Sequence, residues 1–164
     1  MKTCKILILL LVCVPALAVA GYFCLRQPDR RNAVLESAGF FSLTARTLDE
    51  LTEISWTVNG ETKTCKRKDG LWGTADSGNQ GSPEAAEALA EQLVNLQATR
   101  KIENVSSLDG YGLAEPAVTV TAVWEDGSTV YSMGETTPFR DGYYLSLSTR
   151  EDTVYTIASP LMAN

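Results

Sequence analysis

The sequence contains no histidine among its 164 residues. This absence excludes Ser-His-Asp and Cys-His catalytic triads, and it removes the commonest general base and zinc ligand of proteins. Cysteine is scarce as well, because three of the four lie in or beside an apolar N-terminal stretch and only Cys65 lies in the rest of the chain. A single thiol forms neither a disulfide nor a CxxC metal site there. We therefore interpret Cys65 as a small buried strand residue.

Positively charged residues are fewer than negatively charged ones. The formal net charge is −6, from 14 Lys and Arg against 20 Asp and Glu. Only Lys2 and Lys5 precede the apolar stretch, so the rest of the chain carries a charge of −8. An acidic body repels phosphate backbones, and we expect no nucleic-acid partner. The acidic residues lack EF-hand spacing and the glycines lack a G-x-G-x-x-G frame, so the sequence predicts no metal site, no cofactor and no catalytic residue.

Residues 6–25 form the longest uncharged run of the sequence. A helix of this length reaches about 30 Å, which matches the hydrocarbon core of a bilayer. A cleaved signal peptide is the alternative, because Ala18-Val19-Ala20 resembles a cleavage site. The apolar run continues past that site until Arg26, which favours an uncleaved transmembrane helix. A domain of this size can be translocated whatever charges flank the segment, so we expect the body outside the cytoplasm.

The sequence thus divides into three segments. Residues 1–25 are a membrane anchor or signal sequence, residues 26–47 a juxtamembrane spacer, and residues 48–164 an extracytoplasmic domain. We expect a single-pass protein of the cell membrane whose C-terminal domain is extracytoplasmic.

The folded segment shows the alternation of β-hairpins. Residues 54–58 alternate apolar and polar side chains before Asn59-Gly60, and residues 118–124 do so before Asp126-Gly127. Such dipeptides between alternating runs are typical of two-residue hairpin turns. Further strands are predicted at residues 62–68, 71–72, 99–103, 129–133, 143–147 and 153–157. Gly134 is expected to end the strand at 129–133.

One helix is predicted between the two groups of strands. Ser82-Pro83-Glu84 supplies an N-cap hydroxyl, a proline at the first helical position and an acid beside the positive end of the helix dipole. The apolar stripe of this helix consists of Ala86, Leu89, Leu93 and Leu96. The sequence therefore predicts an α+β fold in which antiparallel hairpins form a sheet and one amphipathic helix packs across it, preceded by the transmembrane helix.

Several short motifs occur in a characteristic order over residues 48–160. They are Gly70-Leu71-Trp72, Ser82-Pro83, Tyr111-Gly112-Leu113 with Pro116, Gly134, and Val154-Tyr155-Thr156-Ile157. In this order they resemble the domain of unknown function 4340 family. Members of that family are typically membrane-anchored, and some resemble an auxiliary gliding-motility component associated with ABC-type transporters. The resemblance implies a non-catalytic accessory protein of the bacterial cell envelope, with a membrane-protein complex as partner.

Tyr143 and Tyr144 are the candidate binding residues. They follow a glycine turn on a predicted strand, where adjacent side chains point to opposite faces, so one ring must point outward. Two binding functions stay open: an accessory or scaffolding role beside a membrane complex such as an ABC-type transporter, and a cell-wall or polysaccharide-binding module that uses these tyrosines. A histidine-free hydrolase is a third reading, which would require carboxylates that converge in a pocket. We expect no enzymatic activity.

Overall fold

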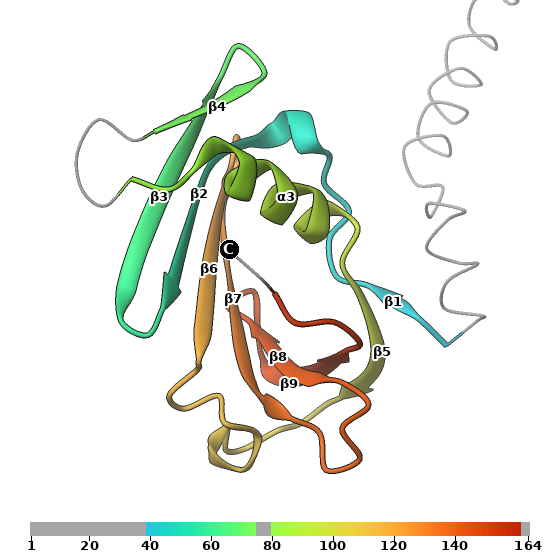
Figure 1. The fold of residues 1–164 in the computed structure, drawn as a ribbon. Helices are drawn as coiled ribbons and strands as arrows, with labels where there is room; N and C mark the ends of the chain where they lie inside the picture. The colour runs from blue at the N-terminus through green and yellow to red at the C-terminus, as the bar shows by residue number, and fades with distance from the viewer. Residues whose placement is uncertain (1–38, 75–79, 162–164) are drawn as a thin grey trace, which may run out of the picture.

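A computed structural model describes residues 39–74 and 80–161 (Figure 1). Nine strands form one sheet in the order β1-β5-β9-β8-β7-β6-β2-β3-β4, and all neighbouring strands are antiparallel. The strands are β1 (Phe41–Ser42), β2 (Leu51–Val58), β3 (Glu61–Lys68), β4 (Leu71–Thr74), β5 (Gln97–Ile102), β6 (Val118–Trp124), β7 (Gly127–Thr136), β8 (Tyr143–Leu147) and β9 (Arg150–Ile157). The helices are α3 (Pro83–Val94) and the short 3-10 helices η1 (Leu48–Glu50) and η2 (Asp109–Tyr111). The predicted antiparallel sheet with one α-helix is confirmed for this part of the chain.

The predicted transmembrane helix at residues 6–25 lies outside the described residues. Among the residues that are described, none of the helices has the length and apolar character needed to cross a bilayer. The segment 26–47 is described from residue 39 onward, and its Phe41 and Ser42 form β1, which pairs with β5 at the sheet edge.

The β2–β3 and β3–β4 hairpins turn at the predicted dipeptides, whereas the β6–β7 hairpin turns at Glu125-Asp126, one residue before the predicted Asp126-Gly127, because Gly127 already pairs with Trp124 as the first residue of β7. Asn59 and Gly60 join β2 to β3 with φ angles of 53° and 79°, and Asp69 and Gly70 join β3 to β4 with φ angles of 52° and 80°. Two successive positive φ angles are the requirement of a type I′ turn, whose twist matches that of the flanking strands. These local residues therefore determine the register of the β2–β3–β4 meander.

Gly134 does not end its strand, so that prediction was wrong. The strand β7 runs on to Thr136, with a register shift between Met133 and Thr136 where it pairs with β8. A Cβ atom at position 134 would lie 2.2 Å from the carbonyl oxygen of Tyr111. Glycine is needed here because the η2 loop approaches the strand closely, as glycines inside strands often permit.

The helix α3 lies across one face of the sheet, beginning near the β4 edge. It begins as predicted, with Ser82 as N-cap accepting a hydrogen bond from the Ala85 amide at 3.1 Å. Its 12 residues span about 18 Å, whereas eight gaps between nine strands span about 38 Å. The helix therefore covers about half of this face, and the sheet curves around it (Figure 1). Because α3 leads from β4 at one edge towards the other, β5 lies near the opposite edge, between β1 and β9.

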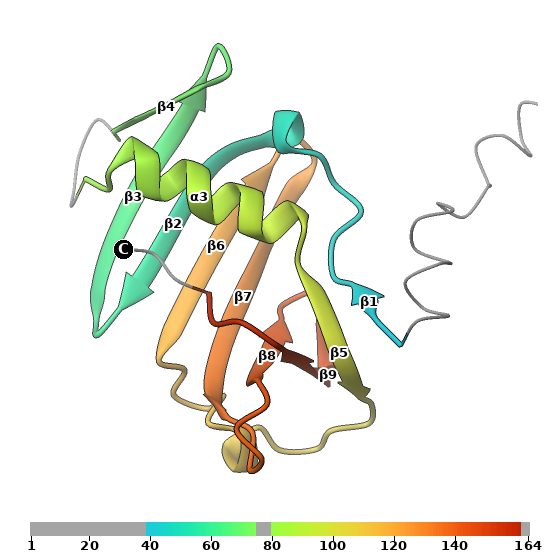
Figure 2. The ribbon, with the colours of Figure 1, turned by 45° about the vertical axis from the view of Figure 1, so that its right-hand side comes forward.

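Part of the remaining concave face is covered by the segment that follows β9. Residues 158–161 run across it below α3 (Figure 2), and Leu161 is 1% exposed. Gln92 of α3 donates a hydrogen bond to the Pro160 carbonyl at 2.7 Å. The core that results includes the buried side chains Leu51, Ile54, Trp56, Leu89, Leu93, Val120, Trp124, Tyr131, Leu145, Tyr155 and Ile157.

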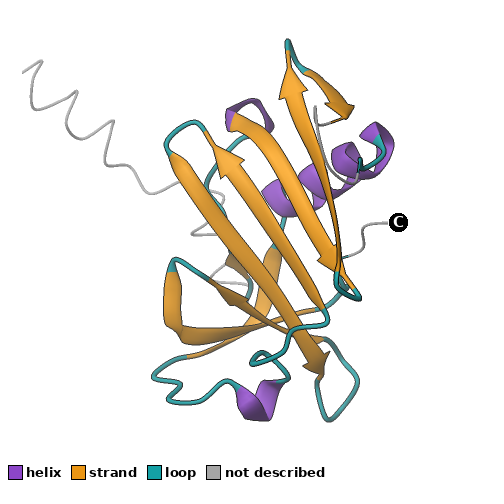
Figure 3. Cartoon of the chain, turned by 90° about the vertical axis from the view of Figure 1, so that its left-hand side faces the viewer, coloured by secondary structure: helices purple, strands orange, loops and turns teal. Residues whose placement is uncertain are grey.

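The opposite face carries no α-helix within the described ranges (Figure 3). Strand pairing brings hydroxyl side chains into one row across β3, β2, β6, β7 and β8. We name this the hydroxyl row; it consists of Thr62, Thr57, Thr119, Ser132 and Ser146. A polar face of this kind is typical of an antiparallel sheet with one side open to solvent.

Candidate functional site

The two predicted binding tyrosines lie on opposite faces of β8. Tyr143 is half-buried, packs against the core and lines a cavity of about 490 Å³ beside residues 158–160. Tyr144 is also half-buried, and its ring meets that of Tyr111 edge-on with centroids 4.9 Å apart and an interplanar angle of 82°. The two rings therefore form no joint surface. Their role in binding stays a prediction, and only Tyr144 shares a face with the hydroxyl row.

The Tyr111-Gly112-Leu113 motif has a structural role. Gly112 ends η2 with a φ of 66°, and Leu113 behind it is only 4% exposed. Gly112 and Gly134 lie so close that a Cβ on Gly134 would be 3.0 Å from the Gly112 carbonyl carbon. The motif thus fastens the connector between β5 and β6 onto β7.

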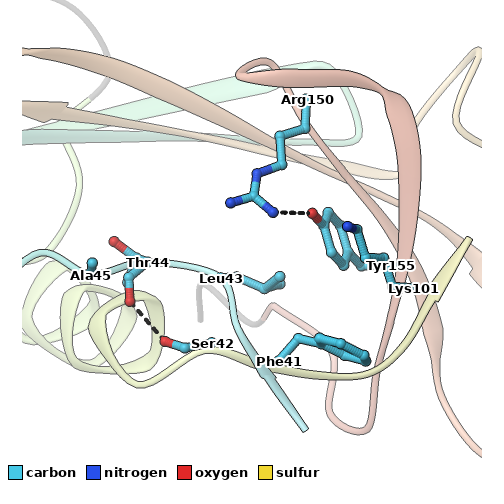
Figure 4. A pocket seen from close by; sticks show the side chains of 8 residues that line it. All are labelled: Phe41, Ser42, Leu43, Thr44, Ala45, Lys101, Arg150 and Tyr155. Carbon is cyan, nitrogen blue, oxygen red and sulfur yellow. Dashed lines mark hydrogen bonds between the residues drawn. The ribbon is translucent and has the colours of Figure 1, made fainter. Parts of the chain in front are cut away.

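A separate cavity at the sheet edge brings together side chains that are distant in the sequence. It has a volume of about 280 Å³ (Figure 4). We name it the edge pocket; its lining residues are Phe41, Ser42, Leu43, Thr44, Ala45, Lys101, Arg150 and Tyr155. They come from β1 and the chain that follows it, from β5 and from β9. The cavity opens because β1 pairs with β5 through only two residues before the chain leaves the edge.

Arg150 is the residue whose charge is best placed to act in this pocket. Its Nη1 donates a hydrogen bond to the hydroxyl oxygen of Tyr155 at 2.8 Å. Tyr155 is 1% exposed, so its buried ring holds the guanidinium in place. Figure 4 shows the guanidinium directed into the space above Leu43. Within the described residues, Arg150 forms none of the ion pairs.

Lys101 contributes a second cation. Its Nζ lies 2.5 Å from a carboxylate oxygen of Glu103, and the lysine side chain is 28% exposed. The hydrogen bond to Glu103 raises the pKa of Lys101, and the nearby charge of Arg150 acts in the opposite direction. Two cations and one carboxylate thus give the edge pocket a local positive charge in an otherwise acidic chain.

The outer wall of the pocket is attached to the core at several points. The Ser42 hydroxyl donates to the Thr44 carbonyl oxygen at 2.8 Å. Burial raises the pKa of Tyr131, and a hydrogen bond with the Thr44 side chain offsets part of this effect. Arg46 forms an ion pair with Asp126, and its guanidinium carbon lies 5.4 Å from the centre of the Trp124 ring. These contacts therefore hold the outer wall of the pocket against the folded domain.

Sequence reasoning missed the edge pocket. Residues 41–45 fall within the predicted spacer, and Lys101 and Arg150 occur without any recognisable spacing. The available signal was weak: Phe41 and Leu43 alternate with Ser42 and Thr44, a pattern typical of a short edge strand.

Two further kinds of site, a metal site and a reactive thiol, find little support in the part of the chain that the structure describes. That part holds no group of three or more His, Cys, Asp or Glu side chains that could bind a metal ion. Cys65 is fully buried in β3, as predicted, and burial raises the pKa of its thiol. Its sulfur donates a long hydrogen bond, 3.6 Å, to the Ser82 carbonyl oxygen.

Over residues 39–74 and 80–161, the fold is a curved antiparallel sheet with one α-helix packed across its concave face. Residues 72–163 match the family described as Domain of unknown function (DUF4340), and the chain belongs to that family. The predicted membership of this family is thereby confirmed, whereas residues 48–71 of the predicted span lie outside the match. The matched region starts in β4 and includes Lys101, Arg150 and Tyr155, whereas residues 41–45 precede it. No curated protein and no solved structure matches the chain.

Proposed function

We propose that the chain is a membrane-anchored, extracytoplasmic accessory domain of the bacterial cell envelope that binds or scaffolds without catalysing a reaction. Its partner would be a membrane complex such as an ABC-type transporter. The observation that carries this proposal is the uncharged segment 6–25, whose length suits a bilayer. Only 15 residues separate Leu25 from Phe41. Even fully extended, they span about 50 Å, which would keep β1 and the edge pocket near the membrane surface.

The edge pocket supports a binding role at that position. It presents two cations, hydroxyl groups and the apolar side chains Phe41 and Leu43 beside the first described strand. Binding sites commonly combine such apolar walls with a few oriented polar groups. The resemblance to membrane-anchored family members supports the same reading.

Cell fractionation tests the anchor. The full chain should remain with the membranes after an alkaline carbonate wash, which releases peripheral proteins. A variant with Leu11→Arg and Val14→Arg should leave them, because each arginine costs about 3 kcal/mol at the centre of a spanning helix. Recovery of the unmodified chain in the soluble cytosolic fraction would contradict the proposal. N-terminal sequencing of the membrane-bound form separates an uncleaved anchor from a processed leader.

Orientation and partner need separate measurements. Protease added to spheroplasts should degrade the folded domain while cytoplasmic proteins stay intact. Cross-linking in intact cells, followed by purification, should recover a membrane-transporter subunit. A domain protected from external protease would contradict the orientation, and a solitary protein after cross-linking would contradict the scaffolding role.

A second candidate function is cell-wall or polysaccharide binding. The observation that favours it is the shared face of Tyr144 and the hydroxyl row, where Ser132 and Ser146 line a cavity of about 320 Å³ together with Glu151. Hydroxyls and a carboxylate can exchange hydrogen bonds with sugar hydroxyls, and an aromatic ring can pack on a sugar's apolar face. In a pull-down on isolated cell wall, Tyr144→Ala should lose binding, whereas Tyr143→Ala, on the other face, should keep it. Equal retention of both variants would exclude this role for Tyr144.

A further inference from the structure

We propose that the edge pocket binds a phosphate group. This assignment names the ligand class of the pocket to which a binding role is given above. It rests on that binding role and is independent of the membrane anchor.

Arg150 supplies the primary contact. A guanidinium presents five N–H donors in a planar fork that matches the oxygens of carboxylates and phosphates. One terminal nitrogen, Nη1, is engaged with the Tyr155 hydroxyl, and the group points into the pocket (Figure 4). Acids outnumber bases in this chain, yet within the described ranges no carboxylate lies within ion-pair distance of Arg150. An external anion is therefore the natural complement of this charge.

The second cation, Lys101, favours phosphate among the possible anions. A phosphate monoester carries a charge of about −1.5 to −2 and three acceptor oxygens. The pocket offers two cations, whereas the Ser42 hydroxyl already donates to the Thr44 carbonyl oxygen and the Thr44 side chain is hydrogen-bonded to Tyr131. Glu103 holds Lys101 in the unliganded protein and so competes with the ligand for its ammonium group. A singly charged carboxylate would use fewer of these donors.

The size of the pocket limits the ligand. Pockets for drug-sized ligands occupy about 300–1,000 Å³. The volume of about 280 Å³ suits a single phosphate group with a few attached atoms. Phe41 and Leu43 provide an apolar wall that could contact carbon atoms next to the phosphate. Free phosphate and the monoester headgroup of phosphatidic acid share this charge and these acceptor oxygens.

Titration calorimetry on the full chain tests the assignment. The protein is held in maltoside micelles, which contain no phosphate, and inorganic phosphate is titrated at constant ionic strength set with chloride. We expect saturable binding at one site. Arg150→Gln should weaken it about tenfold or more, because hydrogen bonds between charged groups are among the strongest. Glu103→Gln should tighten binding, since it releases Lys101.

Arg100→Gln is the matched control. Arg100 lies on β5 next to Lys101, outside the edge pocket, and pairs with Asp141 at 2.8 Å. The substitution changes the net charge by the same amount as Arg150→Gln, so it should leave phosphate affinity within about twofold of the wild type. Thermal unfolding midpoints of all variants verify that each one is folded.

A second titration distinguishes the two sources of phosphate. Dihexanoyl phosphatidic acid, whose headgroup is a phosphate monoester, is used below its critical micelle concentration. Binding about tenfold tighter than inorganic phosphate, with the gain removed by Leu43→Ala, would identify a lipid headgroup as the ligand. Equal affinities would identify a free phosphate.

Three results would overturn the proposal. The first is that neither phosphate compound binds saturably, and the second is that Arg150→Gln and Arg100→Gln lose phosphate affinity equally. The third is that acetate binds as tightly as phosphate. These outcomes are separate from the fractionation experiment. Failure to bind phosphate would leave the membrane anchor and its test intact, and failure of membrane association would leave the titration meaningful.

Discussion

Replacement of Gly134 by alanine is the sharpest test of how the connector between β5 and β6 is held. A Cβ atom there would lie 2.2 Å from the Tyr111 carbonyl oxygen and 3.0 Å from both carbonyl atoms of Gly112. Because these are backbone atoms, rotation of a flexible side chain cannot relieve the overlap. The substitution should therefore push the η2 loop away from β7.

The size of the effect follows from what the loop would lose. Leu113 is 4% exposed, and burial of a leucine side chain contributes about 1.5–3 kcal/mol. The edge-on contact between Tyr111 and Tyr144 adds about 0.5–1.5 kcal/mol. Complete displacement would lower the free energy of unfolding by about 2–4.5 kcal/mol. A typical domain has about 5–15 kcal/mol, so Gly134→Ala should still fold.

The assay is urea unfolding of the full chain, followed by tryptophan fluorescence. Gly73→Ala is the control, because its nearest contact is the Lys66 carbonyl oxygen at 3.9 Å, and it should change stability by no more than about 0.5 kcal/mol. Leu113→Ala should cost less in the Gly134→Ala background than in the wild type, since the loop is already displaced. A Gly134→Ala protein as stable as Gly73→Ala would refute the reasoning, as would additive effects of the two substitutions.

Three further substitutions test other parts of the fold. Gly81→Ala places a Cβ 2.3 Å from the Trp56 ring and should lower the free energy of unfolding by about 1–3 kcal/mol. When Trp56→Phe is added to the same chain, at least about 1 kcal/mol of this loss should be recovered, as measured by urea unfolding in a double-mutant cycle. Ser82→Ala removes the cap of α3 and should lower the free energy of unfolding by about 1 kcal/mol, whereas Ser82→Asp should largely preserve it. The Thr137 hydroxyl lowers the pKa of Asp141 below its usual 3.8. A lowered folded-state pKa stabilises the protein at pH values above the unfolded-state pKa, and this stabilisation is lost as the pH falls through the folded-state pKa. The wild type should therefore exceed Asp141→Asn in melting temperature at pH 7, and the difference should shrink as the pH falls below 3.8. A difference that grows with acidification would contradict this assignment.

The sequence predicts the hairpins and the helix because their determinants are local. The dipeptides Asn59-Gly60 and Asp69-Gly70 adopt the positive φ angles of their turns without help from distant residues. Ser82 caps α3 through an amide three residues away. Gly134 was misread because its environment is non-local: the atoms that require glycine belong to Tyr111 and Gly112, more than 20 residues earlier. Propensity alone assigns such a glycine to a strand end, and only the three-dimensional contact shows a crossing point.

The edge pocket could not be predicted from the sequence because non-local strand pairing brings its residues together. The same pairing explains why these residues form one site. The helix α3 carries the chain from one edge of the sheet towards the other, and β5 therefore pairs with β9. That pairing sets Lys101 opposite Tyr155, and the buried Tyr155 hydroxyl in turn holds Arg150. The two cations are thus positioned by the same strand pair, and residues 41–45 complete the cavity from outside. A substitution that detaches this wall, such as Thr44→Pro, should weaken phosphate binding while Arg150 keeps its contact with Tyr155, so the wall and the cations can be separated by experiment.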